Sequence, residues 1–222
     1  MKNLFLAAAG AALCLSLTAC FSIQVRPIPF HGPTPDLGLT PEQKLPLRLA
    51  VVIPDPMGLR YYLSMQGGRG HSVRQDQTEH FGGEKYLPIP EELSRQAAEA
   101  FPGAFESVSI LRQLPPPGEY DGVVVLAVAA LEENFQWGSP LSGGGTYVEL
   151  SMDWKLSVLG KGNVELLSTQ DSTGTRHFRT KSHTFTDEVM AEDVGREGGL
   201  LLSSITRRAA RMSRDMLAKA AR

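Results

Sequence analysis

The most regular pattern in the chain is an alternation of apolar and polar residues from Thr146 to Val158. Even-numbered positions from Val148 onward are apolar, and odd-numbered positions from Glu149 to Ser157 are polar. A period of two is typical of a strand with one buried and one solvated face. The turn sequence 160–163 follows, and then a more polar segment, 164–178. The pattern therefore predicts a long hairpin with one wet face.

Three shorter apolar segments predict further strands. Residues 47–53 become fully apolar toward Pro54, and residues 105–111 form a short strand pattern. Residues 123–131 are consecutively apolar and rich in valine, which favours a strand buried on both faces over a short buried helix. Residues 55–87 give no clear pattern, although 59–65 has the composition of a strand.

Two segments have the period of a helix. Pro90, followed by Glu91 and Glu92, suits the first turn of a helix. Apolar residues then recur until Pro102-Gly103. Near the C-terminus a stripe at steps of three and four predicts a helix of about twenty residues; its members are Leu201, Ile205, Ala209, Met212, Met216 and Ala220.

This order of strands and helices predicts the fold class. We expect one α/β (α+β) domain over residues 47–222, built as a two-layer sandwich. Its sheet is mixed and mostly antiparallel, and its helices, including the long C-terminal one, pack on one face.

The N-terminus has the pattern of an export signal. Lys2 precedes the apolar stretch 4–17, which is shorter than the ~20 residues that a spanning helix needs. The stretch ends in Leu17, Thr18, Ala19 and Cys20. These four residues resemble the lipobox of bacterial lipoproteins.

The resemblance implies that residues 1–19 are a signal peptide and that Cys20 becomes the lipidated N-terminus. Cys20 would carry a diacylglycerol on its sulfur and an acyl chain such as palmitate on its nitrogen. Because Phe21 rather than aspartate follows, the resemblance implies the periplasmic face of the outer membrane of a Gram-negative bacterium. The alternative is an ordinary secretory peptide that ends near Ala19 and leaves Cys20 as a chance thiol.

Residues 20–46 are rich in proline and predict a tether. Proline fixes φ and removes a backbone donor, so the segment is expected to be extended; the six prolines are Pro27, Pro29, Pro33, Pro35, Pro41 and Pro46. Two interpretations stay open: a spacer that holds the domain away from the membrane, and a segment whose later half lies along the domain surface.

Composition argues against a nucleic acid partner and against a disulfide in the mature fold. The chain has 22 Lys and Arg against 24 Asp and Glu, a net charge of −2, which argues against a nucleic acid partner. Of its two cysteines, Cys14 lies in the expected signal peptide and Cys20 is the expected acylation site. The mature fold is therefore expected to contain no disulfide.

No catalytic or metal-binding motif stands out. The five histidines lack metal-ligand spacing, and no serine lies in a Gly-x-Ser-x-Gly elbow. We therefore expect no cofactor, no metal and no enzymatic activity. An envelope hydrolase whose site is assembled from distant residues, such as Ser142, His71 and Asp76, is the least favoured alternative.

Several exposed cations and one tryptophan are candidate partner contacts. Arg207, Arg211 and Arg214 share one face of the C-terminal helix, and Trp137 begins a glycine-rich connection. A second cationic group, around His177 and His183, is expected to keep an exposed strand from pairing edge to edge. A contact with phosphate or an acidic partner is its alternative.

The lipobox, the tether and the expected α/β architecture together resemble a group of lipoproteins related to the N-terminal domain of TolB. The group includes LpoB, YajG-like lipoproteins and the auxiliary lipoproteins of ABC-type envelope transporters. The resemblance implies an accessory or assembly role in an envelope complex, with other envelope proteins as partners. It transfers no functional residue except Cys20. A module that binds a lipid, glycan or peptide in an apolar cavity between sheet and helices is the alternative.

Overall fold

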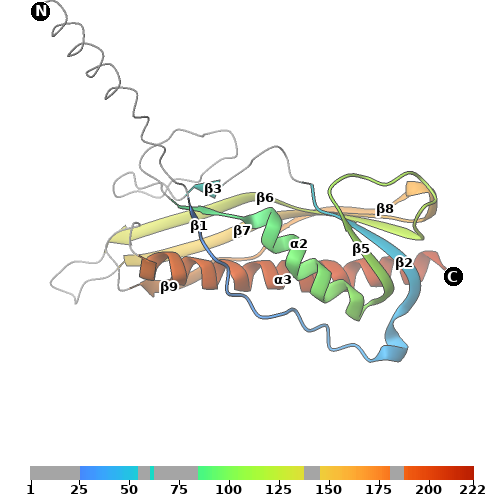
Figure 1. The fold of residues 1–222 in the computed structure, drawn as a ribbon, viewed down its shortest axis with the longest axis horizontal. Helices are drawn as coiled ribbons and strands as arrows, with labels where there is room; N and C mark the ends of the chain where they lie inside the picture. The colour runs from blue at the N-terminus through green and yellow to red at the C-terminus, as the bar shows by residue number, and fades with distance from the viewer. Residues whose placement is uncertain (1–25, 55–60, 63–84, 138–145, 181–187) are drawn as a thin grey trace, which may run out of the picture.

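The computed structural model describes residues 26–54, 61–62, 85–137, 146–180 and 188–222. Its main sheet has the strand order β5 (Phe105–Leu111), β2 (Leu45–Val52), β6 (Gly122–Trp137), β7 (Thr146–Leu159) and β8 (Glu165–Ser172). β2 pairs parallel with β5 and β6, and the remaining pairings are antiparallel. The expected mixed α/β sandwich with helices on one face is confirmed (Figure 1).

The alternating segment forms the centre of the sheet. β7 pairs with β6 from Val123↔Leu159 to Trp137↔Thr146, with one bulge between Val128 and Ala130. Its even-numbered side chains, Val148 to Val158, are buried, and most odd-numbered ones are at least partly exposed. The single strand expected over 164–178 is instead two strands. β8 and β9 (Arg176–Thr180) pair with successive halves of β7, and Gly174, with φ +73°, lies between them.

Two helices cover one face of the main sheet. α2 (Ile89–Ala100) has Pro90 in its first turn and continues as the 3₁₀ turn η2 (Phe101–Gly103). α3 (Glu188–Ala220) has 33 residues and is longer than the apolar stripe predicts. The extra turns contain Gly195, Gly198 and Gly199, which break an apolar pattern because they carry no side chain.

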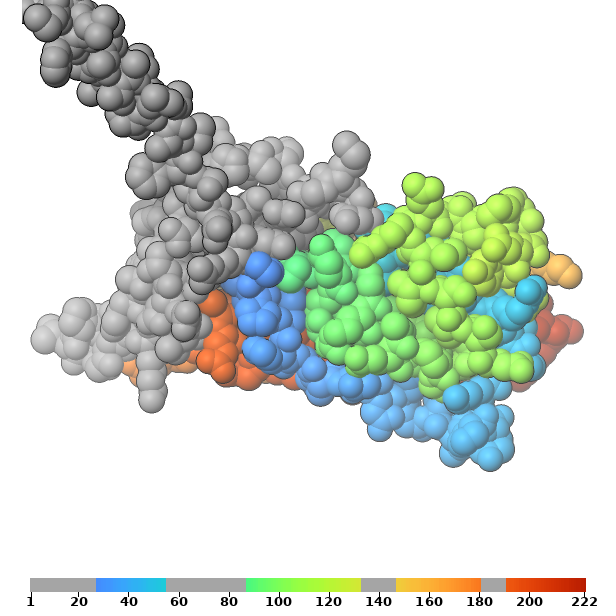
Figure 2. All heavy atoms as spheres, in the orientation of Figure 1, coloured from blue at the N-terminus to red at the C-terminus, as the bar shows by residue number. Residues whose placement is uncertain are grey.

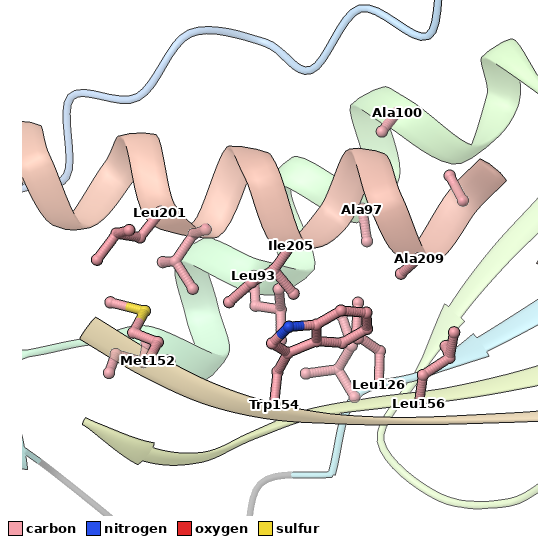
Figure 3. Close-up of a cluster of buried hydrophobic side chains, with 14 of the residues drawn as sticks. Leu93, Ala97, Ala100, Leu126, Met152, Trp154, Leu156, Leu201, Ile205 and Ala209 are labelled. Carbon is pink, nitrogen blue, oxygen red and sulfur yellow. The ribbon is translucent and has the colours of Figure 1, made fainter. Parts of the chain in front are cut away.

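The core lies between these helices and the sheet. Trp154 of β7, 1 % exposed, packs among leucine, isoleucine and alanine side chains from β6, α2 and α3 (Figure 3). A smaller cluster on the opposite face of the sheet contains Ala50, Val52, Val123 and Leu159. β6 therefore has buried side chains on both faces, as its run of valines predicts.

Short elements complete the described structure. β1 (Arg26–Pro27), β4 (Lys85–Leu87) and β3 (Tyr61–Tyr62) form a small separate sheet. The 3₁₀ turns η1 (Pro41–Gln43) and η4 (Lys161–Asn163) precede β2 and β8. Among the helices of the described ranges, none combines the length and the apolar character needed to cross a bilayer.

Candidate functional site: the docked N-terminal segment

The N-terminal segment follows the surface of the domain. We call residues 28–44 the strap. It passes beside α2 and α3 before it enters β2 (Figures 1 and 2). Ile28 is fully buried and Leu37 is 4 % exposed, and both belong to the main core. The sequence leaves two interpretations of the proline-rich segment open. Its described part, residues 26–46, agrees with the second, in which the segment lies along the surface of the domain.

Three glycines of α3 make room for the strap. A Cβ at Gly195 would lie 2.1 Å from the carbonyl oxygen of Pro29, and one at Gly199 would lie 2.6 Å from the backbone nitrogen of Gly32. At Gly198 it would meet the ring of Phe30 at 2.8 Å. Glycine inside a helix costs ~1 kcal/mol relative to alanine, so these positions reduce the intrinsic stability of α3. In return, the backbone of the strap contacts the backbone of the helix directly.

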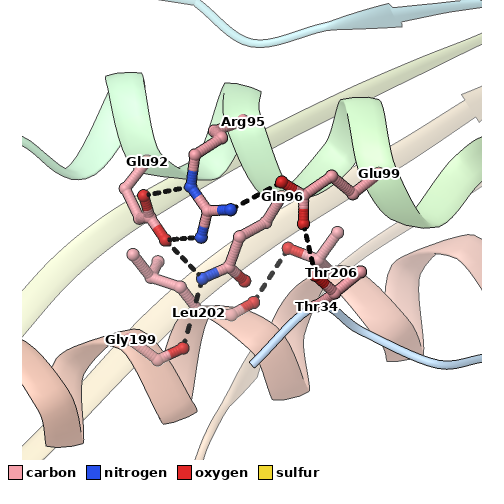
Figure 4. Close-up of polar contacts among 8 residues, drawn as sticks. All are labelled: Thr34, Glu92, Arg95, Gln96, Glu99, Gly199, Leu202 and Thr206. Atoms are coloured by element: carbon pink, nitrogen blue, oxygen red, sulfur yellow. Dashed lines mark hydrogen bonds and ion pairs between the residues drawn. The ribbon is translucent and has the colours of Figure 1, made fainter. Parts of the chain in front are cut away.

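A polar network on α2 lies next to the strap. The fully buried Gln96 donates from Nε2 to Glu92 Oε1 at 2.7 Å and to the carbonyl oxygen of Gly199 at 3.3 Å (Figure 4). Arg95 pairs with Glu92 and Glu99, and the hydrogen bond to Glu92 raises the pKa of Arg95 above its ordinary value. The Thr34 hydroxyl of the strap donates to Glu99 Oε2 at 2.8 Å. The network thus links α2 to both α3 and the strap.

Two of the predicted partner contacts donate hydrogen bonds to the strap. Arg211 Nη2 donates to the carbonyl oxygen of Leu37 at 2.8 Å, and Arg214 Nε donates to that of Gln43 at 3.0 Å. Arg207 is exposed on α3. Its neighbour Arg208 lies over the Trp154 ring and pairs with Asp171 of β8. The sequence shows that arginines share a helix face, but it does not show that the chain's own carbonyl groups occupy them.

The described cations of β9 also have partners within the domain. Arg176 pairs with the largely buried Glu197 of α3, His177 lies 3.4 Å from Glu149, and Arg179 lies over the ring of Tyr147. These contacts hold the edge strand to its neighbours. Lys181 and His183 lie outside the described residues.

Replacing Glu197 with glutamine should lower the free energy of unfolding by about 1–2 kcal/mol. A hydrogen bond to a charged group contributes ~1.5–3 kcal/mol, and solvent around the half-exposed Arg176 reduces that value. Denaturant titration measures the loss. Glu192→Gln, at an exposed position of the same helix, should change stability by less than ~0.5 kcal/mol. Equal losses in both variants would show that the contact with Arg176 stabilises nothing.

The other predicted site residues can be placed only in part. Trp137 is the last residue of β6, where its backbone pairs with Thr146, rather than part of the connection. Cys20 and the rest of the lipobox, and also Ser142, His71 and Asp76, lie outside the described residues. Within the described ranges, no group of three or more His, Cys, Asp or Glu side chains is arranged to hold a metal ion.

Comparisons with known proteins give a shared fold and no family. No family model and no curated protein matches the sequence. A DUF330 protein from Xanthomonas campestris matches with a TM-score of 0.54 and 14 % identity, over 86 % of this chain and 98 % of its own.

Two further solved structures match less well. One, an uncharacterized protein, matches with a TM-score of 0.31 and 15 % identity, over 78 % of this chain and 95 % of its own. The other, a minor lipoprotein from Acinetobacter baumannii, matches with a TM-score of 0.33 and 10 % identity, over 80 % of this chain and 95 % of its own. The fold described above is therefore one that this chain shares with the DUF330 protein.

Proposed function

We propose that this protein is a lipoprotein anchored to the periplasmic face of the outer membrane, where it serves as a non-enzymatic accessory or assembly component of an envelope complex. The observation that carries the proposal is the sequence Leu17-Thr18-Ala19-Cys20 at the end of an apolar stretch. Acyl chains contribute ~0.8 kcal/mol per buried CH₂, so the three chains on Cys20 anchor the protein stably without a spanning helix.

The packing of the domain supports an accessory role over ligand binding. A ligand-binding module needs an apolar cavity between the sheet and the helices. In the described residues, the side chains between the sheet and the helices are buried and form one core cluster, Trp154 among them. Contacts to other envelope proteins would therefore come from residues on the surface of the domain. Arg207 and Trp137 remain the proposed partner contacts, whereas Arg211 and Arg214 act by holding the strap.

Cys20→Ala should abolish acylation and separate the domain from its partner. In cells supplied with labelled palmitate, we expect the wild-type chain to incorporate label and Cys20→Ala to incorporate none. A photo-crosslinking residue at Arg207 should form adducts with envelope proteins in the wild-type background and lose them in Cys20→Ala, because the domain no longer reaches the outer membrane.

Cys14→Ala is the matched control. It removes the other cysteine, which lies in the signal sequence, and should leave labelling and adducts unchanged. An unmodified N-terminus on the purified wild-type protein, or its recovery as a soluble protein without detergent, would contradict the anchoring. Label without adducts at Arg207 would contradict this residue as a partner contact.

A further inference from the structure

We infer that the strap sets both the height and the orientation of the domain on the membrane: the end of the domain that carries β1, β9 and the first turns of α3 faces the lipid. We call this the near end. The inference rests on the proposed acylation of Cys20 and goes beyond it, because acylation alone permits any orientation.

The first step is where the chain becomes fixed to the domain. Arg26 and Pro27 pair with Lys85 and Tyr86 of β4, and Ile28 is fully buried. The backbone of His31 then donates to the carbonyl oxygen of Gly195 at 3.4 Å. Further along the strap, Thr34, Leu37 and Gln43 each bind a side chain of α2 or α3. The domain therefore holds the chain from Arg26 onward.

The second step is the length of chain that remains between the lipid and this point. Six peptide steps separate Cys20 from Arg26. At ~3.3–3.6 Å per residue, they span at most about 20 Å. If the whole proline-rich segment were free as far as Leu45, the same rule would allow roughly 80 Å. Docking of the strap thus converts a long spacer into a short link.

The third step is the position of this point in the domain. The strap contacts α3 at Gly195, two turns from the helix start at Glu188, and α3 continues to Ala220. With a rise of 1.5 Å per residue, Ala220 lies about 38 Å further along the helix. In Figure 1, β1 and β9 lie toward the end where α3 begins, and the C-terminus lies at the opposite end. A short link therefore keeps the near end close to the bilayer, whereas the far end of α3 can extend about 38 Å further from it.

Energy transfer from two positions on α3 tests this orientation. Both Glu192 and Lys219 are exposed, and ~40 Å of helix separates them. A Glu192→Cys or Lys219→Cys substitution in the acylated full chain provides one free thiol for a donor dye. The protein is bound to vesicles of phosphatidylethanolamine and phosphatidylglycerol that carry a headgroup-labelled acceptor. We expect several-fold stronger transfer from position 192 than from position 219.

The second measurement is energy transfer in a variant whose link between Cys20 and Arg26 is longer. Inserting twenty Gly and Ser residues after Val25 leaves every strap contact intact and adds a flexible chain of about 25 Å average span. Transfer from position 192 should then fall, and the difference between the two positions should shrink. Gly195→Val should have the same effect by displacing Pro29, and circular dichroism checks that this variant remains folded.

The failures of the two proposals are distinguishable. If the wild-type protein does not float with vesicles, Cys20 is not acylated, and both proposals are overturned. If it floats and transfer is equal at both positions, or stronger from position 219, only the orientation is overturned. If the insertion leaves transfer from position 192 unchanged, the short link does not set the height of the domain.

Discussion

Trp154→Ala should lower the free energy of unfolding by about 3–5 kcal/mol. The side chain is 1 % exposed and lies where β7 meets both helices, in contact with the main core. Removing a large buried aromatic side chain loses its transfer free energy and leaves a cavity that a close-packed interior fills only in part. Arg208, which lies over the indole ring, also loses this contact. Denaturant unfolding followed by circular dichroism measures the change.

Tyr147→Ala is the control on the same strand. Its side chain is 49 % exposed and projects from the opposite face of β7. We expect a loss of up to ~1 kcal/mol, which includes the contact between the ring and Arg179. Similar losses for the two variants would contradict the assignment of even-numbered positions to the core.

Ile28→Ala should lower the free energy of unfolding by about 2–5 kcal/mol, although residue 28 lies outside the expected domain range 47–222. The side chain is fully buried in the main core, and its Cγ2 methyl group lies 3.1 Å from the position that a Cβ on Gly195 would occupy. Truncating a buried isoleucine to alanine removes apolar contacts and creates a cavity. Loss of this contact should also release the strap, so limited proteolysis should cut within residues 28–44 faster than in the wild-type chain.

His31→Ala is the control for Ile28→Ala. It separates the loss of a buried side chain from a general effect of substitutions in the strap. This residue lies in the same strap, but its side chain is exposed, and its contact with Gly195 uses only the backbone. We expect a change within ~0.5 kcal/mol and an unchanged cleavage rate. If Ile28→Ala behaved in the same way, the strap would be a loose tether rather than part of the folded unit.

Local periodicity predicted much of the fold because each pattern reports burial of one face. The alternation from Val148 to Val158 identifies a half-buried strand, and the stripe from Leu201 to Ala220 identifies a helix face. The part of α3 before Leu201 was not predicted, because Gly195, Gly198 and Gly199 place no apolar side chain on the face that contacts the strap. The strap packs there, with its backbone at Gly195 and Gly199 and with the Phe30 ring at Gly198. The hydrophobic pattern of a helix does not record contacts made at glycine.

The contacts of the strap could not be predicted from the sequence for a related reason. Proline predicts an extended chain but does not indicate what the chain lies against. Ile28 and Leu37 are isolated apolar residues with no period. Their partners, including Gly195 and Arg211, lie more than 160 residues away in the sequence. Likewise, the spacing of Arg207, Arg211 and Arg214 shows a shared face, while only the folded chain shows which of them are already occupied.

The sequence by itself determined the class of elements and the layered architecture, because strand and helix periods are local properties of the chain. It also supplied the lipobox resemblance, which depends on adjacent residues. Only the tertiary structure decided that β2 lies between β5 and β6 and that the strap, residues 28–44, docks on the helices. Those arrangements depend on contacts between distant segments, whose free energy comes from mutual burial and from shared hydrogen bonds that neither segment has alone.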